Sequence, residues 1–193
     1  MRSLAPALLL SMPQMRDPNF LRTVILLCKH NDEGAFGLVM NRPLVTTGRV
    51  VVNLDPPVST ERELEVWIGG PVEPVSSWML VGARQEEAQM FSGMPIVEGL
   101  SLSTSPDLLR RLLEPNPPVD TRLIVGYSGW GAGQLEAELE ESAWLLSDVD
   151  RDLLFAATAH HNEFRKLPIA PGFNQNRRHI NGYSMGIARG DFP

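Results

Sequence analysis

Short apolar runs separated by turn residues dominate the chain, and they predict a protein built mainly of strands. Six such runs stand out, at 7–11, 23–29, 36–40, 64–68, 78–81 and 123–127. The runs VILLC and LIVG are apolar throughout instead of alternating, which indicates strands covered on both faces. The polar stretch HNDEGA separates the second run from the third, and Gly34 can adopt a positive φ there. These two runs are therefore expected to pair as a hairpin.

One helix is predicted from the stretch TSPDLLRRLLE. Thr104 or Ser105 can cap its start, and Pro106 suits the first helical position. The apolar positions repeat at helical spacing and give one buried face, and the sequence PNPP at 115–118 ends the helix. That face consists of Leu108, Leu109, Leu112 and Leu113.

A second helix is predicted after the glycine-rich stretch that begins at residue 126. Leu135 and Leu139 share a face of it, and Leu146 extends that face. Strands and helices do not alternate strictly along the chain, which favours an α+β arrangement over a doubly wound parallel sheet. We expect a single compact domain with a coiled, mixed β-sheet and a few flanking helices.

Length and charge refine this picture. A chain of 193 residues with 43% hydrophobic content suits one domain with a sizeable core. The net charge of −6 and the pI near 5.2 argue against a surface that grips nucleic acid by its phosphates. Residues 1–150 hold 11 Lys and Arg against 20 Asp and Glu, whereas residues 151–193 hold 6 against 3. We therefore expect a domain over 1–155 and an irregular, basic tail over 156–193.

The cysteine count and the start of the chain bear on location. Cys28 is the only cysteine, so no disulfide can form within the chain and a reducing compartment is the simple expectation. The apolar run at 4–10 resembles a signal peptide, but Pro6 interrupts it and no small-residue cleavage pattern follows. We expect a buried strand there, in a cytoplasmic protein with no membrane association.

The stretch GYSGWGAGQLEAELEE, residues 126–141, poses the question of phosphate binding. A P-loop needs Gly-Lys followed by Ser or Thr, yet no lysine occurs between Lys29 and Lys166. The dinucleotide fingerprint would place its third glycine at Gln134. Glutamates early in the following helix would also repel a phosphate. We expect a sharp turn between a strand and a helix, packed around Trp130, and no nucleotide cofactor.

Other candidate chemistry is incomplete. Cys28 and His30 are expected on the same side of one strand, as a thiol–imidazole pair that lacks further partners. Ser128 follows a strand, but the chain has no GxSxG elbow. The tail offers a further set of possible metal ligands without a recognised spacing. These are His160, His161 and His179 with Glu163. We therefore predict neither a catalytic set nor a metal site.

Several motifs follow one another along residues 4–155 in a recognisable order. They are Met12-Pro13, Asp17 with Phe20, His30, Gly34-Ala35 with Gly37, Asn41-Arg42-Pro43, Gly69-Gly70-Pro71-Val72, and Gly129-Trp130 with Gly133-Gln134-Leu135-Glu136. In these motifs the chain resembles the AlgH/YqgE family of bacterial proteins. The resemblance implies a compact α+β fold with coiled, branched sheets and no established enzymatic activity. The family's name implies a transcriptional regulator, here an indirect one, since no basic helix-turn-helix is recognisable.

The leading hypothesis is a non-enzymatic regulatory or protein-interaction factor that binds a partner protein or a small ligand. Its candidate surface gathers the motif residues at strand ends and glycine turns, with Trp130 as an apolar platform. The surface comprises Asn41, Arg42, Gly69, Gly70, Pro71, Trp130 and Gln134. One alternative is an enzyme that binds a small molecule or a nucleotide, such as a hydrolase using Ser128 or Cys28 with His30. Another is DNA binding through Arg165, Lys166, Arg177 and Arg178 of the tail.

Overall fold

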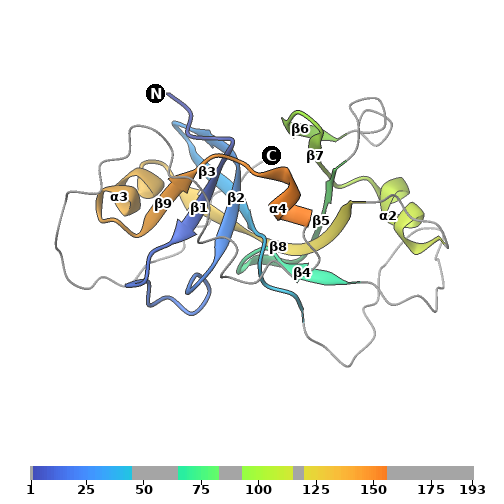
Figure 1. The fold of residues 1–193 in the computed structure, drawn as a ribbon, viewed down its shortest axis with the longest axis horizontal. Helices are drawn as coiled ribbons and strands as arrows, with labels where there is room; N and C mark the ends of the chain where they lie inside the picture. The colour runs from blue at the N-terminus through green and yellow to red at the C-terminus, as the bar shows by residue number, and fades with distance from the viewer. Residues whose placement is uncertain (1, 45–64, 83–92, 115–119, 156–193) are drawn as a thin grey trace.

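The computed structural model describes residues 2–44, 65–82, 93–114 and 120–155 (Figure 1). In these ranges the chain forms a mostly antiparallel open sheet with short helices beside it, so the predicted α+β class is confirmed. The strands follow the order β6-β7-β5-β8-β3-β2-β1-β9, and β4 lies against β8. No described helix is long and apolar enough to cross a membrane.

One half of the sheet is made from the beginning of the chain and β9. β1 (Ala7–Ser11) pairs with β2 (Val24–Asn31) on one side and with β9 (Trp144–Ser147) on the other. β2 and β3 (Gly34–Val39) form the predicted hairpin, in which Asn31 lies opposite Gly34. All these pairs are antiparallel.

The other half is formed by β4 (Val66–Ile68), β5 (Val72–Val81), β6 (Met94–Val97) and β7 (Leu100–Ser103). Its central strand is β8 (Thr121–Gly131), which joins the two halves. The first part of β8 pairs with β4 and β5, and the last part pairs with β3. Between them lies Gly126 with a φ of 69°, a conformation that favours glycine. The long curve of β8 through the molecule is visible in Figure 1.

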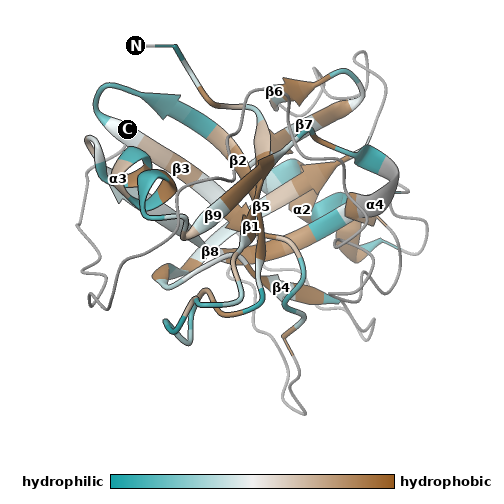
Figure 2. Cartoon of the chain, turned by 60° about the vertical axis from the view of Figure 1, so that its left-hand side comes forward, coloured by the Kyte–Doolittle hydropathy of each residue, from teal (hydrophilic) through white to brown (hydrophobic). Residues whose placement is uncertain are grey.

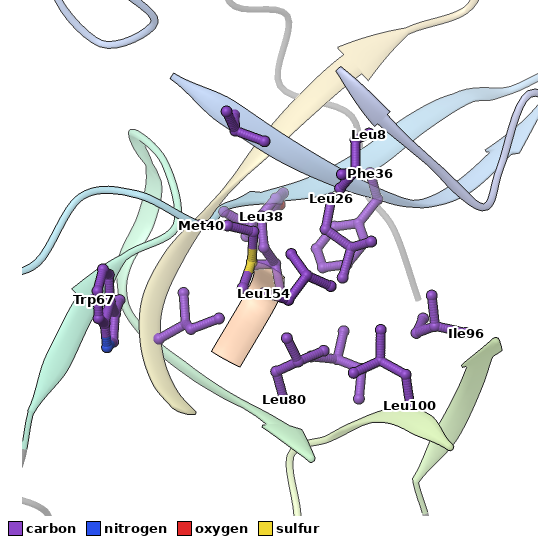
Figure 3. Close-up of a cluster of buried hydrophobic side chains, with 14 residues drawn as sticks. Leu8, Leu26, Phe36, Leu38, Met40, Trp67, Leu80, Ile96, Leu100 and Leu154 are labelled. Carbon is purple, nitrogen blue, oxygen red and sulfur yellow. The ribbon is translucent and has the colours of Figure 1, made fainter. Parts of the chain in front are cut away.

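The sheet separates three apolar clusters. Side chains of both halves meet in the largest cluster, where residues of β1, β2 and β3 face β5, β6 and β7 (Figure 3). A second cluster, around Leu9, Ile25 and Trp144, lies on the other side of the first half. The third joins Met79 and Leu123 to helix α2 (Pro106–Leu113). In Figure 2 the strands at the centre are mostly hydrophobic, whereas the outer end of the β2–β3 hairpin is hydrophilic.

Several local predictions are confirmed. β1 spans the predicted residues, and α2 begins after an N-cap at Ser105, with Pro106 at its start and its four leucines buried. The other two described helices are α3 (Gln134–Glu140) and α4 (Arg151–Phe155). The predictions for PNPP and for the tail from residue 156 concern positions outside the described ranges.

Two predictions around the glycine-rich stretch are wrong. The glycines at 126, 129 and 131 lie within β8 and do not form a turn after it; only Gly133, with a φ of 73°, stands at the start of α3. Leu146 does not extend that helix, because the chain leaves it after Glu140 and Leu146 enters β9 as the partner of Leu9. A strand pairing with β1 therefore overrides the helical spacing of the leucines.

Candidate functional site

Arg42 leaves the end of β3 and holds the loop that precedes β2. Its Nη1 donates to the carbonyl of Asn19 at 2.9 Å, and its Nη2 donates to the carbonyl of Pro18 at 3.2 Å. Among the described residues, no carboxylate forms an ion pair with Arg42. Its side chain, at a partly exposed position, therefore organises backbone carbonyls and has no carboxylate partner in the part of the chain that the structure describes.

Asn41 holds the same loop from its other end. Its Nδ2 donates to the carbonyl of Arg22 at 2.9 Å, while its Oδ1 accepts the backbone N–H of Val24 at 3.0 Å. We call residues 17–22 the clamped loop. Inside it, the Asp17 carboxylate accepts the N–H of Asn19, and the Asp17 carbonyl accepts two further N–H groups of the loop. Side chains and turns thus fix this loop firmly.

The clamped loop presents a basic and apolar surface. Leu21 is 42% exposed, and Arg22 after it and Arg16, which precedes the loop, are exposed as well. Arg22 has a φ of 57°, an unusual conformation for a residue other than glycine. Counting the partly exposed Arg42 that holds it, this stretch has three arginines and the single carboxylate of Asp17, in a chain of net charge −6. We call Arg16, Leu21, Arg22 and Arg42 the clamped-loop surface.

Gly69 and Gly70 lie close to Arg42 and act through their backbone. The N–H of Ile68 donates to the carbonyl of Arg42, and the N–H of Val39 donates to the carbonyl of Gly69. At Gly70 a Cβ atom would collide with the carbonyl of Tyr127, so a side chain does not fit there. Both glycines are buried, and Pro71 after them is half-buried. This part of the predicted surface therefore lies near Asn41 and Arg42 but offers few side-chain groups.

Trp130 and Gln134 belong to a different place, a buried network around Glu138 of α3. The Glu138 Oε2 accepts the indole N–H of Trp130 at 2.9 Å and that of Trp144 at 2.7 Å. Its Oε1 accepts Nε2 of Gln134 at 3.0 Å, and Oε1 of Gln134 accepts the N–H of Gly131. We call this the carboxylate–indole network. Trp130 is only 3% exposed, so it is not the apolar platform that the sequence suggested.

The seven predicted residues are thus divided between two locations. Trp130 pairs with Ala35, and Asn41 follows six residues later, roughly 20 Å along an extended chain. Phe20 of the clamped loop links the two locations, since its ring stacks on Trp130 with centroids 6.4 Å apart. It also packs edge-on against Trp144 at 5.7 Å. The sequence placed Arg42 and Trp130 on the candidate surface, whereas Asp17 and Phe20 of the loop between them were noted only as a motif.

His30 is buried and fully bonded. Its Nδ1 accepts the backbone N–H of Leu4 at 3.0 Å, and its Nε2 lies 2.8 Å from Oε1 of Glu136. Both ring nitrogens are therefore occupied by these two partners. Of the glutamates early in α3, Glu136 is the partner of His30, and Glu138 is buried in the carboxylate–indole network.

The predicted pairing of Cys28 with His30 is wrong. A β-bulge between Leu27 and Lys29 makes Cys28 the extra residue of β2 and reverses the alternation of side chains beyond it. Cys28 packs against the largest cluster, whereas His30 lies opposite Ala35, which belongs to the second cluster. The two side chains thus face opposite sides of the sheet. Burial also raises the pKa of the Cys28 thiol, which keeps it neutral.

Ser128 is also without a catalytic partner. It is fully buried, and its hydroxyl donates to the carbonyl of Gly69 at 3.0 Å. No group of three or more His, Cys, Asp or Glu residues suited to a metal ion occurs in the described ranges. The histidines of the tail and the basic residues considered for DNA binding lie outside those ranges.

Comparison with known proteins gives a consistent result. A family model described as AlgH-like matches residues 8–169. A UPF0301 protein of Thioalkalivibrio sulfidiphilus is 38% identical over 149 residues, covering 76% of this chain and 78% of the relative. A UPF0301 protein of Vibrio cholerae is 37% identical and covers 84% and 91%, respectively. The solution structure of the AlgH protein from Pseudomonas aeruginosa matches with a TM-score of 0.62 at 32% identity, covering 86% of this chain and 90% of that one.

Proposed function

The chain belongs to the AlgH-like family, and from its clamped loop we propose that it is a non-enzymatic protein-interaction factor. Any regulatory effect on transcription is then indirect and passes through the partner protein. We also place this role in the cytoplasm, a proposal supported by the single cysteine of the chain.

One observation carries the proposal: Arg42 is fixed by two loop carbonyls yet has no carboxylate partner among the described residues. A guanidinium group has five N–H donors, and the two carbonyl bonds leave others available. Because those bonds set its orientation in advance, little side-chain freedom is lost when a partner binds. A preorganised cation of this kind suits an acidic side chain of a partner protein.

The rest of the clamped-loop surface fits the same partner. The exposed Arg16 adds positive charge, and the exposed Leu21 offers an apolar contact. Apolar anchors surrounded by charged groups are a common arrangement in protein interfaces. The ligand is therefore an acidic segment with an apolar residue, and its affinity should fall as salt rises.

The enzyme alternative has no support in the geometry. His30 bonds Leu4 and Glu136, Ser128 bonds Gly69, and Cys28 lies on the opposite face of the sheet from His30. A nucleophile needs a base within hydrogen-bond reach, and neither candidate has His30 there.

The test is affinity capture of partners from native cells, followed by direct binding of the captured protein. Arg16→Glu and Leu21→Ser change exposed groups without removing a described hydrogen bond. Arg2→Glu and Val75→Ser are matched controls, since Arg2 is exposed and Val75 is 92% exposed.

We expect the first pair to weaken binding by on the order of tenfold, the effect of about 1.4 kcal/mol, and the controls to bind as the wild type does. Equal binding by all five proteins would contradict the proposal. Arg42→Ala should also weaken binding. Because it also removes the hydrogen bonds to the clamped loop, its result counts only if its circular dichroism spectrum matches that of the wild type.

A further inference from the structure

His30 lies where three segments meet: strand β2, helix α3 and residues 2–6, which precede β1. Its side chain is 1% exposed, and that of Glu136 is 25% exposed. The N–H of Leu4 is 3.0 Å from Nδ1, and Oε1 of Glu136 is 2.8 Å from Nε2. The ring therefore bridges the segment before β1 to α3.

The partners determine which nitrogen carries the proton. A backbone N–H only donates, so Nδ1 must present its lone pair to Leu4. Nε2 then carries the hydrogen in the neutral ring and donates it to the Glu136 carboxylate. The arrangement observed is that of a neutral histidine with one defined tautomer.

We propose that His30 is a pH-sensitive latch that holds residues 2–5 on the protein when neutral and releases them when protonated. Protonation places a hydrogen on Nδ1, directly opposite the N–H of Leu4, so that bond is lost and two donors face each other. The bond from Nε2 to the Glu136 carboxylate persists and becomes an ion pair between two charged groups. The ring therefore stays on α3 while the Leu4 contact breaks. Because docking favours the neutral ring, acidification favours the released segment.

The charged surroundings of the ring are simple. Glu136 of α3 is the one ionisable side chain bonded to it within the described ranges. The same hairpin carries the exposed residues Lys29, Asp32 and Glu33, and β3 has no ionisable residue. In the segment before β1, Arg2 is exposed. Protonation of the ring therefore breaks mainly the hydrogen bond from Leu4 and strengthens the contact with the Glu136 carboxylate.

Release would alter an apolar edge. Leu4 and Ala5 pack on the second cluster, as do Leu139 of α3 and Leu146 of β9. When residues 2–5 leave, part of this apolar surface is uncovered to water. The latch thus couples the charge of one buried ring to exposure of a hydrophobic edge.

The test is an NMR titration of the full-length chain from about pH 8 to about pH 5, the range in which histidines change charge. We expect the Nε2–H tautomer at high pH and a Leu4 amide shift that follows the His30 ring. The Leu4 amide protection factor, corrected for intrinsic exchange, should fall by about tenfold on ring protonation, the order expected for one net hydrogen bond.

One variant separates a latch from a passive contact. His30→Gln can accept from Leu4 and donate to Glu136 without titrating, so its Leu4 protection should not change with pH. A wild-type Leu4 amide that stays protected while His30 titrates would overturn the proposal. So would an Nδ1–H tautomer at high pH, or a ring that does not titrate.

Discussion

Replacing Glu138 should expose how much of the stability depends on the carboxylate–indole network. Glu138→Ala leaves the indole N–H groups of Trp130 and Trp144 without their acceptor in a buried site. A stranded buried donor costs about 1–3 kcal/mol, so the two indoles imply a loss of about 2–6 kcal/mol. Gln134 is half-buried and can turn to water, so it adds little. The expected loss is a large part of the about 5–15 kcal/mol that stabilises a typical domain.

Glu138→Gln provides the matched comparison. Its amide oxygen can occupy the position of Oε2 and keep both indole bonds, while its NH₂ group meets Gln134. Only that last contact must rearrange, so we expect a loss of about 1 kcal/mol. Glu140→Ala changes an exposed acid of the same helix and should stay within about 0.5 kcal/mol of the wild type.

Urea unfolding followed by circular dichroism and tryptophan emission measures all three variants. Glu140→Ala should be the most stable of the three variants, Glu138→Gln the next, and Glu138→Ala the least stable. Equal midpoints for Glu138→Ala and Glu140→Ala would refute the account of the network. If Glu138→Ala does not fold, Glu138→Gln provides the test. A loss of stability in Glu138→Gln as large as that expected for two indole N–H groups without an acceptor would show that hydrogen bonding alone does not explain the site.

Two further predictions concern β8 and the thiol. Gly126→Ala should destabilise the protein by about 2–4 kcal/mol, since its Cβ would lie 2.5 Å from the carbonyl oxygen of Gly70 and its φ is 69°. Gly133→Ala has a similar φ but open space around it, so it should destabilise the protein by only about 1 kcal/mol. Equal losses of unfolding free energy in urea would contradict this prediction. Burial raises the pKa of the Cys28 thiol, so the contribution of the neutral thiol to the free energy of unfolding is complete below about pH 8.5, where the unfolded thiol begins to ionise, and is lost as pH rises above it. The free energy of unfolding should therefore fall between about pH 7.5 and about pH 10, and it should fall less in Cys28→Ala. The same fall in both proteins would count against this prediction.

Local signals in the sequence were sufficient for elements whose cause is local. β1 is a short apolar run between prolines, and α2 carries its own proline and leucine face, with Ser105 at the N-cap position but without a capping bond from its side chain. The β2–β3 hairpin follows from a polar turn and Gly34, which pairs with Asn31. In each case, the residues that determine the element lie within it.

Elements shaped by distant partners were missed or misread. Glycines at 126, 129 and 131 looked like a turn, yet Gly126 lies inside β8, where its positive φ coincides with the irregular register against β5. β9 lacked a strand signal of its own and forms against β1. The short strands β6 and β7 likewise depend on pairing with each other and with β5.

The candidate site divides in the same way. Arg42 was recognised as an unusual charge at a strand end, but its carbonyl partners in residues 17–22 lie more than twenty positions earlier. Nothing local distinguished Glu138 from the exposed acids of its helix, and its burial follows from the two indoles. The bulge at Cys28, which turns His30 to the other face, is set by pairing with β3. Exposed Leu21 gave no signal until the loop around it was seen to be fixed.

The central claim is that the clamped-loop surface contacts a partner protein. Photo-crosslinking in native cells tests it most directly, with a light-activated amino acid placed at Leu21 in one protein and at Val75 in another, since both side chains are exposed. We predict a discrete adduct of one additional protein from position 21, reduced when Arg16→Glu is added, and none from position 75. No adduct from position 21, or the same adduct from both positions, would contradict the claim.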